Sequence, residues 1–211
     1  MPPSNPPPAA AIAVLEGAAV EPTVLVLYAH PNPRISRINR RLADAASGID
    51  GVDLDDLYET YPDLDIDVVR ERARAARAEV LVLLFPVHWY GAPALLKEWF
   101  DAVLYDAWQR ERFKPTASGA ARRCWLVASC GSAATDFAPG GRHRRPLRDY
   151  LAPFEQAAHV CGMRWLEPLL LYAAHDIDNA AVDAHVAQFT AQLRQLAGAA
   201  MPTATGAIDG I

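Results

Sequence analysis

Buried strand signals alternate with helix signals along most of this sequence, and this alternation constrains the fold more than any other feature. Continuous apolar runs such as TVLVLYA at 23–29 and EVLVLLFP at 79–86 are typical of strands covered on both faces. The expected strands are 23–29, 52–58, 79–86, 123–131 and 163–173, and the expected helices are 36–47, 65–78, 92–108, 146–162 and 178–197. Such alternation predicts a doubly wound α/β domain, with a five-stranded parallel sheet and helices on both faces.

The alternation occupies residues 23–197, and the two ends of the chain do not share it. Residues 1–22 are rich in proline and alanine, have no basic start, and carry Glu16 inside their short apolar part. We therefore expect a flexible extension rather than a signal peptide, with an arm that docks on a partner subunit as the alternative. Residues 198–211 are expected to form a flexible C-terminal tail.

Composition narrows the classes of function. Of 211 residues, 52% are hydrophobic and 21% are charged, as in a globular protein, and the net charge of −5 argues against nucleic acid as a partner. The cysteines Cys124, Cys130 and Cys161 are odd in number and lack metal-ligand spacing, which favours reduced intracellular thiols and no metal centre. No apolar run approaches the roughly 18 residues of a membrane span. These features predict a cytoplasmic protein.

Ligands of doubly wound sheets bind in the crevice beyond the carboxyl ends of the strands. The loop after strand 23–29 lacks G-x-G-x-x-G and the Gly-Lys-Ser/Thr of a P-loop. It does carry His30 at the strand end, and Ser36 and Asn39 at the start of a helix, where free N–H groups attract anions. The loop therefore suits a single phosphate group. The alternative is that Ser36 only caps the helix and His30 is a turn residue.

Two further loops are expected at the same edge of the sheet. FPVHWYGAP at 85–93 places Trp89 and Tyr90 after a buried strand, which suits a planar ring, although the pair could instead cap the following helix. SCGSAATDF at 129–137 contains Gly131 among small residues, which leaves room for a ligand, although an ordinary turn has the same pattern. A phosphate loop, an aromatic loop and a small-residue loop together fit flavin mononucleotide (FMN).

From about Thr23 to Leu196 the sequence resembles the flavodoxin-like NAD(P)H:quinone oxidoreductases, and within them the ancillary oxidoreductases of glutathione-gated (Kef-type) potassium efflux systems. The matching stretches are YAHPNPRISRIN, DLYETYPDLDID, FPVHWYGAPALLKEWFDAV and CGMRW. The resemblance implies strand order 2-1-3-4-5 and FMN, or as second choice FAD, bound between the subunits of a homodimer. The helix at 93–104, with Trp99 and Phe100, is a candidate for the dimer interface, and ordinary packing against the sheet is the alternative.

The resemblance also implies which residues hold the flavin, in three groups that follow the three loops. The phosphate and ribityl end would be held by His30, Ser36, Arg37, Ile38 and Asn39. The isoalloxazine ring would be bordered by Val87, His88, Trp89 and Tyr90, and its other polar edge by Cys130, Gly131, Ser132 and Ala133.

The chain departs from the family pattern in the third loop and just after it. The usual Thr-x-Gly-Gly is replaced by Ser-Cys-Gly-Ser at 129–132, and a usual tyrosine is replaced by Phe137. His143, six residues later, is therefore the expected catalytic residue, which would stabilise negative charge at the flavin. It lies in the basic loop GRHRRPLR at 141–148, which is either simply solvated or attracts the phosphates of NADPH.

The resemblance implies a two-electron oxidoreductase. NADPH or NADH would pass a hydride to the flavin and leave, and a quinone would then take the same place, which predicts ping-pong kinetics. Two alternatives stay open: an FMN-dependent azo or nitro reductase, and a regulatory subunit of a potassium efflux transporter with secondary flavin activity. The second alternative would place the protein peripherally at the inner face of the membrane.

Overall fold

The structure is a computed structural model, and it describes residues 23–105 and 119–200. The expected extension at 1–22, the end of the expected helix at 106–108, and residues 201–211 of the expected tail lie outside the described residues. Residues 198–200 were also assigned to the tail, but they continue the last helix.

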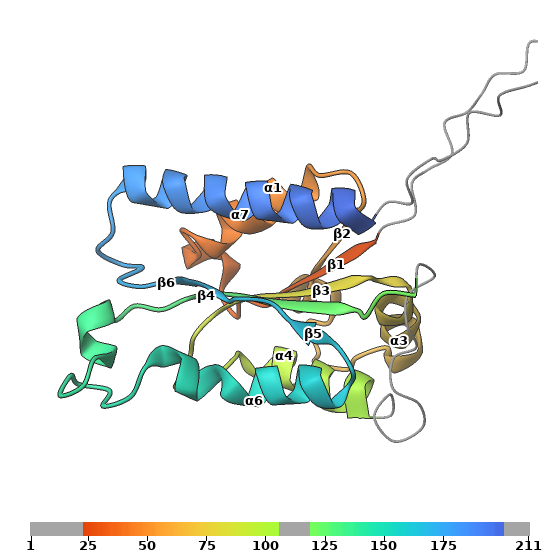
Figure 1. Ribbon diagram of the computed structural model, residues 1–211, viewed down its shortest axis with the longest axis horizontal. Helices are drawn as coiled ribbons and strands as arrows, with labels where there is room; N and C mark the ends of the chain where they lie inside the picture. Colours follow the sequence, from red (N-terminus) through yellow and green to blue (C-terminus); the bar gives the residue numbers. More distant parts are fainter. Residues whose placement is uncertain (1–22, 106–118, 201–211) are drawn as a thin grey trace, which may run out of the picture.

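A parallel sheet runs through the middle of the molecule, as Figure 1 shows edge-on. Its main strands are β1 (Val24–Tyr28), β2 (Val52–Asp56), β3 (Val80–Pro86) and β4 (Arg123–Ser129), followed by the short β5 (Arg164–Trp165) and β6 (Leu169–Leu171). The strand order is β2-β1-β3-β4-β5, with β6 also paired to β4. The predicted doubly wound α/β fold and the strand order 2-1-3-4-5 are confirmed.

The fifth predicted strand, 163–173, is wrong as a single element. β5 pairs with Arg123 and Cys124 at the start of β4, and β6 pairs with residues 127–129 at its end. Pro168 lies between the two short strands. Proline has no N–H to donate to a sheet ladder, so the pairing with β4 is interrupted at Pro168. It resumes in β6, which ends where the loop at 172–178 begins.

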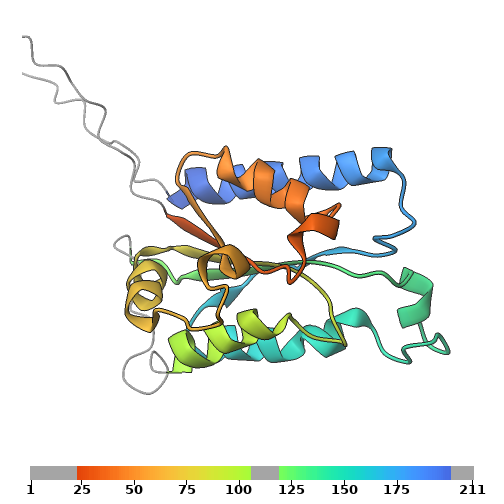
Figure 2. The same ribbon diagram turned by 180° about the vertical axis from the view of Figure 1, so that it is seen from behind.

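Helices cover both faces of the sheet. One face carries α1 (Asn39–Ser47) and α7 (Asn179–Ala200), and the other carries α3 (Val68–Arg77), α4 (Ala94–Trp99) and α6 (Leu147–Val160), as Figures 1 and 2 show from opposite sides. Shorter elements complete the fold: the 3-10 turns Pro33–Ile35 and Ala134–Phe137, the single-turn helix α2 (Leu57–Thr60) and the π-helical segment Phe100–Leu104.

Large apolar side chains fill the space on each side of the sheet. Trp125 of β4 stacks on Phe189 of α7 with ring centroids 5.5 Å apart, and Phe85 of β3 meets Phe154 of α6 at 5.6 Å on the other side. Trp99 and Phe100, the candidate interface residues, are 0% and 7% exposed and belong to the core. For these two side chains the alternative, ordinary packing against the sheet, holds.

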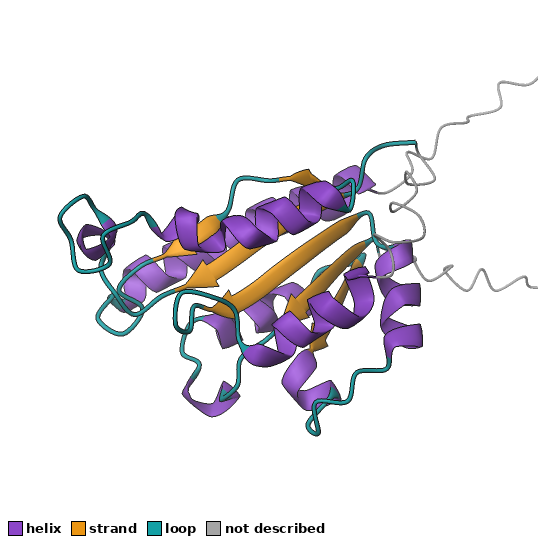
Figure 3. Ribbon diagram, turned by 90° about the horizontal axis from the view of Figure 1, so that it is seen from below, coloured by secondary structure: helices purple, strands orange, loops and turns teal. Residues whose placement is uncertain are grey.

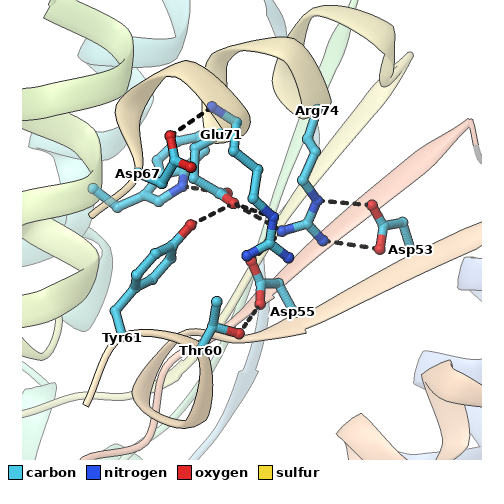
Figure 4. Close-up of polar contacts among 9 residues, drawn as sticks. Asp53, Asp55, Thr60, Tyr61, Asp67, Glu71 and Arg74 are labelled. Atoms are coloured by element: carbon cyan, nitrogen blue, oxygen red, sulfur yellow. Dashed lines mark hydrogen bonds and ion pairs between the residues drawn. The ribbon is translucent and has the colours of Figure 1, made fainter. Parts of the chain in front are cut away.

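A buried polar network joins β2 to three helices, and Figure 4 shows it in close-up. Glu71 of α3 accepts hydrogen bonds from Tyr61 Oη at 2.9 Å and from Trp99 Nε1 at 2.9 Å. Arg74, one turn later, donates to Glu71 at 3.0 Å and to both oxygens of Asp53 on β2 at 2.8 and 3.0 Å. Its remaining contact is the neighbouring buried carboxylate Asp55. Since each buried charge has a partner, the network fixes α3 relative to the sheet.

All strands of the sheet point the same way, so the loops that follow them gather at one edge. This edge lies at the left of Figure 1, and Figure 3 shows the parallel strand arrows from below. Within residues 23–105 and 119–200, no helix is both long and apolar enough to cross a membrane.

Candidate functional site

A cavity of about 140 Å³ opens beyond the carboxyl ends of β1, β3 and β4. It lies where the chain order reverses between β1 and β3, the place at which doubly wound sheets bind ligands. We call it the strand-end cavity. Its walls come from all three predicted loops and from the loop after β6: His30, Ile35, Ser36, Arg37, Ile38, Asn39, Pro86, Val87, His88, Ser129, Cys130, Gly131, Ala174 and His175.

His30 stands at the end of β1 with its ring 8% exposed. Its Nδ1 accepts a hydrogen bond from the backbone N–H of Asn32 at 3.1 Å, so the neutral ring carries its proton on Nε2. Burial lowers the pKa of His30, and the nearby ring of His88 lowers it further. His30 therefore offers the cavity a neutral N–H donor rather than a charge.

The side chains of Ser36 and Arg37 are engaged within the protein. The N-cap residue of α1 is Ile38 rather than Ser36, but Ser36 Oγ accepts a hydrogen bond from the backbone N–H of Arg40 in the first turn at 3.0 Å. The guanidinium of Arg37 donates to the carbonyl of Ile177 at 2.8 Å and to Oδ1 of Asn179 at 2.7 Å. These bonds tie the first loop to the start of α7 and hold its backbone in place at the cavity wall.

Asn39 is the polar side chain that this wall leaves unsatisfied. It is 2% exposed, it lines the cavity, and its Oδ1 has no hydrogen-bond partner. A buried polar atom without a partner costs about 1–3 kcal/mol. The first turn of α1 adds backbone N–H groups that have no acceptor inside the helix. Donors and an orphaned acceptor together fit a ligand with a phosphate and hydroxyl groups.

The tip of the aromatic loop is a tight hairpin that does not line the cavity. The backbones of His88 and Gly91 exchange hydrogen bonds of 2.9 and 3.0 Å, with Trp89 and Tyr90 between them. Both have left-handed backbones, with φ of 46° and 67°, in a turn type that favours Asn and Gly. Trp89 is 94% exposed at the tip. Strain of this kind is retained where a function requires it.

Tyr90 turns toward His143 and starts a hydrogen-bonded chain beside the cavity. Tyr90 Oη lies 3.3 Å from His143 Nδ1, and His143 Nε2 lies 2.9 Å from Ser132 Oγ. The ring of Phe137 stacks on the imidazole with centroids 4.4 Å apart, and Tyr150 lies 4.7 Å from the Tyr90 ring. We call these five residues the histidine cluster. Phe137 has no hydroxyl group, and the tyrosine hydroxyl that meets His143 comes from Tyr90 in another loop.

Gly131 in the third loop makes room for a side chain of this protein. A Cβ atom added there would lie 2.8 Å from Cδ2 and 2.9 Å from Nε2 of His175. His175 follows β6, and with Ala174 it forms part of the cavity that the sequence analysis missed. Cys130 is 6% exposed, and burial raises the pKa of its thiol to about 11, so the thiol stays protonated.

The predicted site residues thus fall into two adjoining groups. Those that line the strand-end cavity are His30, Ser36, Arg37, Ile38, Asn39, Val87, His88, Cys130 and Gly131. Those that the structure places beside it are Trp89, Tyr90, Ser132, Ala133 and His143. Ile35, Pro86 and Ser129 also line the cavity and belong to the three predicted loops, whereas Ala174 and His175 lie in a fourth loop that was not predicted. These last two were findable, because they follow a strand of the same sheet.

A second, more apolar cavity of about 450 Å³ lies between the π-helical segment and α6. Phe100, Leu104 and Phe154 are among its walls. Its charged residues Lys97 and Asp101 are paired with each other at 2.5 Å, so they offer no free charge to a ligand. Although larger, this groove lacks the convergent polar groups of the strand-end cavity.

An open, doubly wound parallel sheet with a cavity at its switch point is the arrangement in which α/β proteins bind ligands beyond their strand ends. Comparison with known proteins is more specific. The family model described as having a flavodoxin-like fold matches residues 22–196, and the chain belongs to that family. This match and the Kef ancillary relatives described next confirm the resemblance to the flavodoxin-like NAD(P)H:quinone oxidoreductases and their Kef-type ancillary branch.

The relatives and solved structures agree with this assignment. The glutathione-regulated potassium-efflux system ancillary protein KefG of Cronobacter sakazakii is 41% identical over 151 residues, which cover 72% of this chain and 81% of KefG. The ancillary protein KefF of Enterobacter sp. strain 638 is 33% identical, over 81% of this chain and 94% of KefF. General stress protein 14 of Treponema denticola, solved in complex with FMN, is 28% identical with a TM-score of 0.73, over 83% and 99% of the two chains.

Proposed function

We propose that the protein is an FMN-dependent NAD(P)H:quinone oxidoreductase of the cytoplasm. The observation that carries the proposal is the strand-end cavity, which joins a helix start, the buried unpaired oxygen of Asn39 and the neutral donor His30. The phosphate of FMN would accept hydrogen bonds at the helix start, and its ribityl hydroxyls would donate to the oxygen of Asn39. Its flat ring would lie on the side of the aromatic hairpin. FMN bound to a related protein of the same fold supports this choice.

The residues present fit the parts of FMN in order. Backbone N–H groups of 37–39 would hold the phosphate, because the side chains of Ser36 and Arg37 only keep that backbone in place. Val87 and His88 on one side, and Cys130 and Gly131 on the other, would border the ring. Bound FMN would supply two-electron hydride transfer from the nicotinamide donor to the acceptor.

His143 would supply and receive the proton that accompanies quinone reduction. Its two ring nitrogens face two hydroxyl groups, Tyr90 Oη and Ser132 Oγ, which can each donate or accept. The imidazole can therefore hold a proton on either nitrogen without losing a hydrogen bond. Phe137 and Tyr90 pack around the ring and restrict its rotation. Proton transfer by a positioned histidine contributes typically about 10²–10⁴-fold to a rate.

An absorbance experiment tests the proposed function. The purified protein is saturated with FMN, free flavin is removed, and NADPH or NADH is added under argon before a quinone. We expect retained flavin that bleaches and then recovers with quinone, and parallel double-reciprocal plots for the two substrates. Recovery with an azo or nitro compound but not with a quinone would assign the acceptor to that class. Absence of retained flavin would refute the interpretation of all three loops.

A regulatory role at a potassium efflux transporter is a second candidate, favoured by the identity of 41% to an ancillary protein of such a system. In that role the protein would bind the cytoplasmic side of the transporter, and flavin chemistry would be secondary. Retained flavin that never bleaches, together with co-purification of the transporter from detergent-solubilised membranes, would favour this role over catalysis.

A further inference from the structure

Three arginines beside the histidine cluster have no partner in the described part of the protein. Arg142, Arg144 and Arg145 are exposed, and none of them forms an ion pair or a side-chain hydrogen bond with a described residue. The next arginine differs, because Arg148 is ion-paired with Glu167. Three adjacent unpaired cations stand out in a protein whose net charge is −5.

The loop that carries these arginines is held rigidly. The backbone N–H of His143 donates to the carbonyl of Asp136 at 2.8 Å, and Tyr150 Oη donates to the carbonyl of His143 at 2.5 Å. Gly141 packs so tightly that a Cβ atom there would lie 2.5 Å from the carbonyl oxygens of Thr135 and Asp136. A solvated basic loop needs no such support, whereas a preorganised loop loses little entropy when it binds a ligand.

The position of the loop indicates which anion it meets. His143, between Arg142 and Arg144, contacts Tyr90 of the aromatic hairpin, whose tip exposes Trp89. A nicotinamide ring that stacks on this hairpin would have its phosphates a short distance away. Guanidinium groups bind phosphate oxygens through two parallel hydrogen bonds.

We propose that Arg142, Arg144 and Arg145 form an anion site for the phosphate groups of the nicotinamide dinucleotide donor. The inference rests on the proposed function and adds the part of the protein that binds the donor. The phosphates have two sources: the diphosphate common to NADH and NADPH, and the 2′-phosphate that only NADPH carries. Both have the same chemistry toward guanidinium, and experiment separates them.

The test compares two triple variants that change charge equally. In the first, Arg142, Arg144 and Arg145 are replaced by Gln; in the matched control, Arg77, Arg164 and Arg194 are replaced by Gln. The control arginines are exposed and lie near the opposite edge of the sheet, at the end of α3, in β5 and late in α7. Both variants are expected to fold and to retain FMN, because none of the first three side chains forms an ion pair or a hydrogen bond with a described residue.

Calorimetry provides the readout that does not depend on turnover. Flavin-loaded protein is titrated with 2′,5′-ADP, which carries the 2′-phosphate of NADPH, and with ADP-ribose, which carries the diphosphate. We expect the loop variant to bind at least one probe about tenfold more weakly than the parent, equivalent to about 1.4 kcal/mol, and the control to bind like the parent. Weaker binding of 2′,5′-ADP alone identifies the 2′-phosphate as the recognised group, and weaker binding of ADP-ribose identifies the diphosphate.

Steady-state kinetics gives a second readout. For the loop variant we expect kcat/KM to fall about tenfold with NADPH, or with both donors if the diphosphate is recognised, and kcat at saturation to remain. Equal affinities of parent and loop variant for both probes, or an equal loss in the control, would overturn the proposal. Failure of flavin to bleach with either donor would refute the proposed function instead, and calorimetry would still decide the anion site.

Discussion

At the scale of single residues, His143 has contacts that its basic sequence neighbourhood does not suggest. Hydroxyl groups from two other loops reach its two ring nitrogens, and Phe137 packs on its face. Replacement of the expected tyrosine by Phe137 therefore leaves His143 with a hydroxyl partner, because Tyr90 approaches from the hairpin. Tyr90 and Phe137, which both pack against His143, are 47 residues apart in the sequence.

His143→Ala should slow the bleaching of the flavin by NADPH about a hundredfold, because the variant loses the group that stabilises the negative charge of the reduced flavin. Anaerobic stopped-flow absorbance measures this rate directly. His159→Ala is the matched control, since His159 is exposed at the end of α6. A rate unchanged from the parent would remove His143 from the mechanism.

Gly131→Ala should weaken FMN binding about tenfold, equivalent to about 1.4 kcal/mol, because the new methyl group must displace the ring of His175 at the cavity wall. The free energy of unfolding should change little, since His175 is exposed and can rotate away. Fluorescence titration with FMN measures the affinity. Gly48→Ala, where the added methyl would meet no atom closer than 4.0 Å, should behave like the parent. Equal affinity in both variants would contradict the role given to His175.

His185 should make the fold less stable in acid. It is 7% exposed on α7, its Nε2 has no partner, and burial lowers its pKa from 6.5. As pH falls below 6.5, the unfolded chain binds a proton that the folded protein does not, so the free energy of unfolding decreases until the lower, folded-state pKa is passed. His185→Leu should remove this loss. Urea denaturation should therefore show a larger gain in the free energy of unfolding, variant over parent, at pH 5 than at pH 8. His159→Leu, on an exposed surface, should show none.

At the scale of elements, the segment at 56–67, one of the stretches that match the Kef-type branch, has a structural role. Asp56 caps α2, Asp67 caps α3, and Tyr61 donates to the buried Glu71. The segment therefore sets where α3 begins and how it attaches to the sheet. A stretch shared within one branch of a protein family can thus reflect side-chain packing rather than the chemistry of the site.

Glu71→Ala should destabilise the protein by about 3–5 kcal/mol, the usual loss when one member of a buried ionic network is removed. Tyr61 Oη and Trp99 Nε1 would lose their acceptor, and Arg74 would lose one of its three carboxylates. Urea denaturation of the FMN-loaded protein measures the change. Glu98→Ala, an exposed glutamate of α4, is the control. If Glu71→Ala does not fold, Tyr61→Phe should still show a loss of about 1 kcal/mol.

Much of the fold could be predicted because apolar runs report burial directly. β1 and β3 are buried along their whole length, as their continuous apolar sequences indicate. The short α2 was missed because the alternation VDLDDLY continues past the point where Asp56 caps a helix. The interruption at Pro168 was missed although the sequence contains the signal, because a proline inside an apolar run has no N–H to donate to a sheet ladder.

From the sequence, the candidate site could be predicted only for residues that directly follow a strand of the sheet. The expectation that three loops meet holds for His30, His88 and Cys130, which line one cavity. The direction of Trp89 and Tyr90 was not accessible, because their left-handed backbones are unusual for aromatic residues. Tyr90 reaches His143 because of the same left-handed turn, so this contact could not be predicted from the sequence either.

At the scale of the whole molecule, the exposed hairpin supports the predicted homodimer. A tryptophan that is 94% exposed at the rim of a binding cavity is an unusual surface residue, and tryptophan is enriched at the energetic centres of interfaces. Light scattering should give twice the mass of one chain at micromolar concentration. Trp89→Ala should weaken the dimer at least about tenfold, whereas Val69→Ala, at an apolar residue of α3 that is 80% exposed, should not. A monomer at high concentration would refute the prediction.

The left-handed turn at Trp89 and Tyr90 has a consequence for attempts to evolve or engineer this protein. Replacing the pair with Asn-Gly would relieve backbone strain of about 1–3 kcal/mol per residue, so heat-resistance selection should find such changes readily. The same changes would remove the exposed indole and the phenol that reaches His143. Variants selected for thermal stability alone should therefore lose activity. A screen that also requires turnover should keep the aromatic pair.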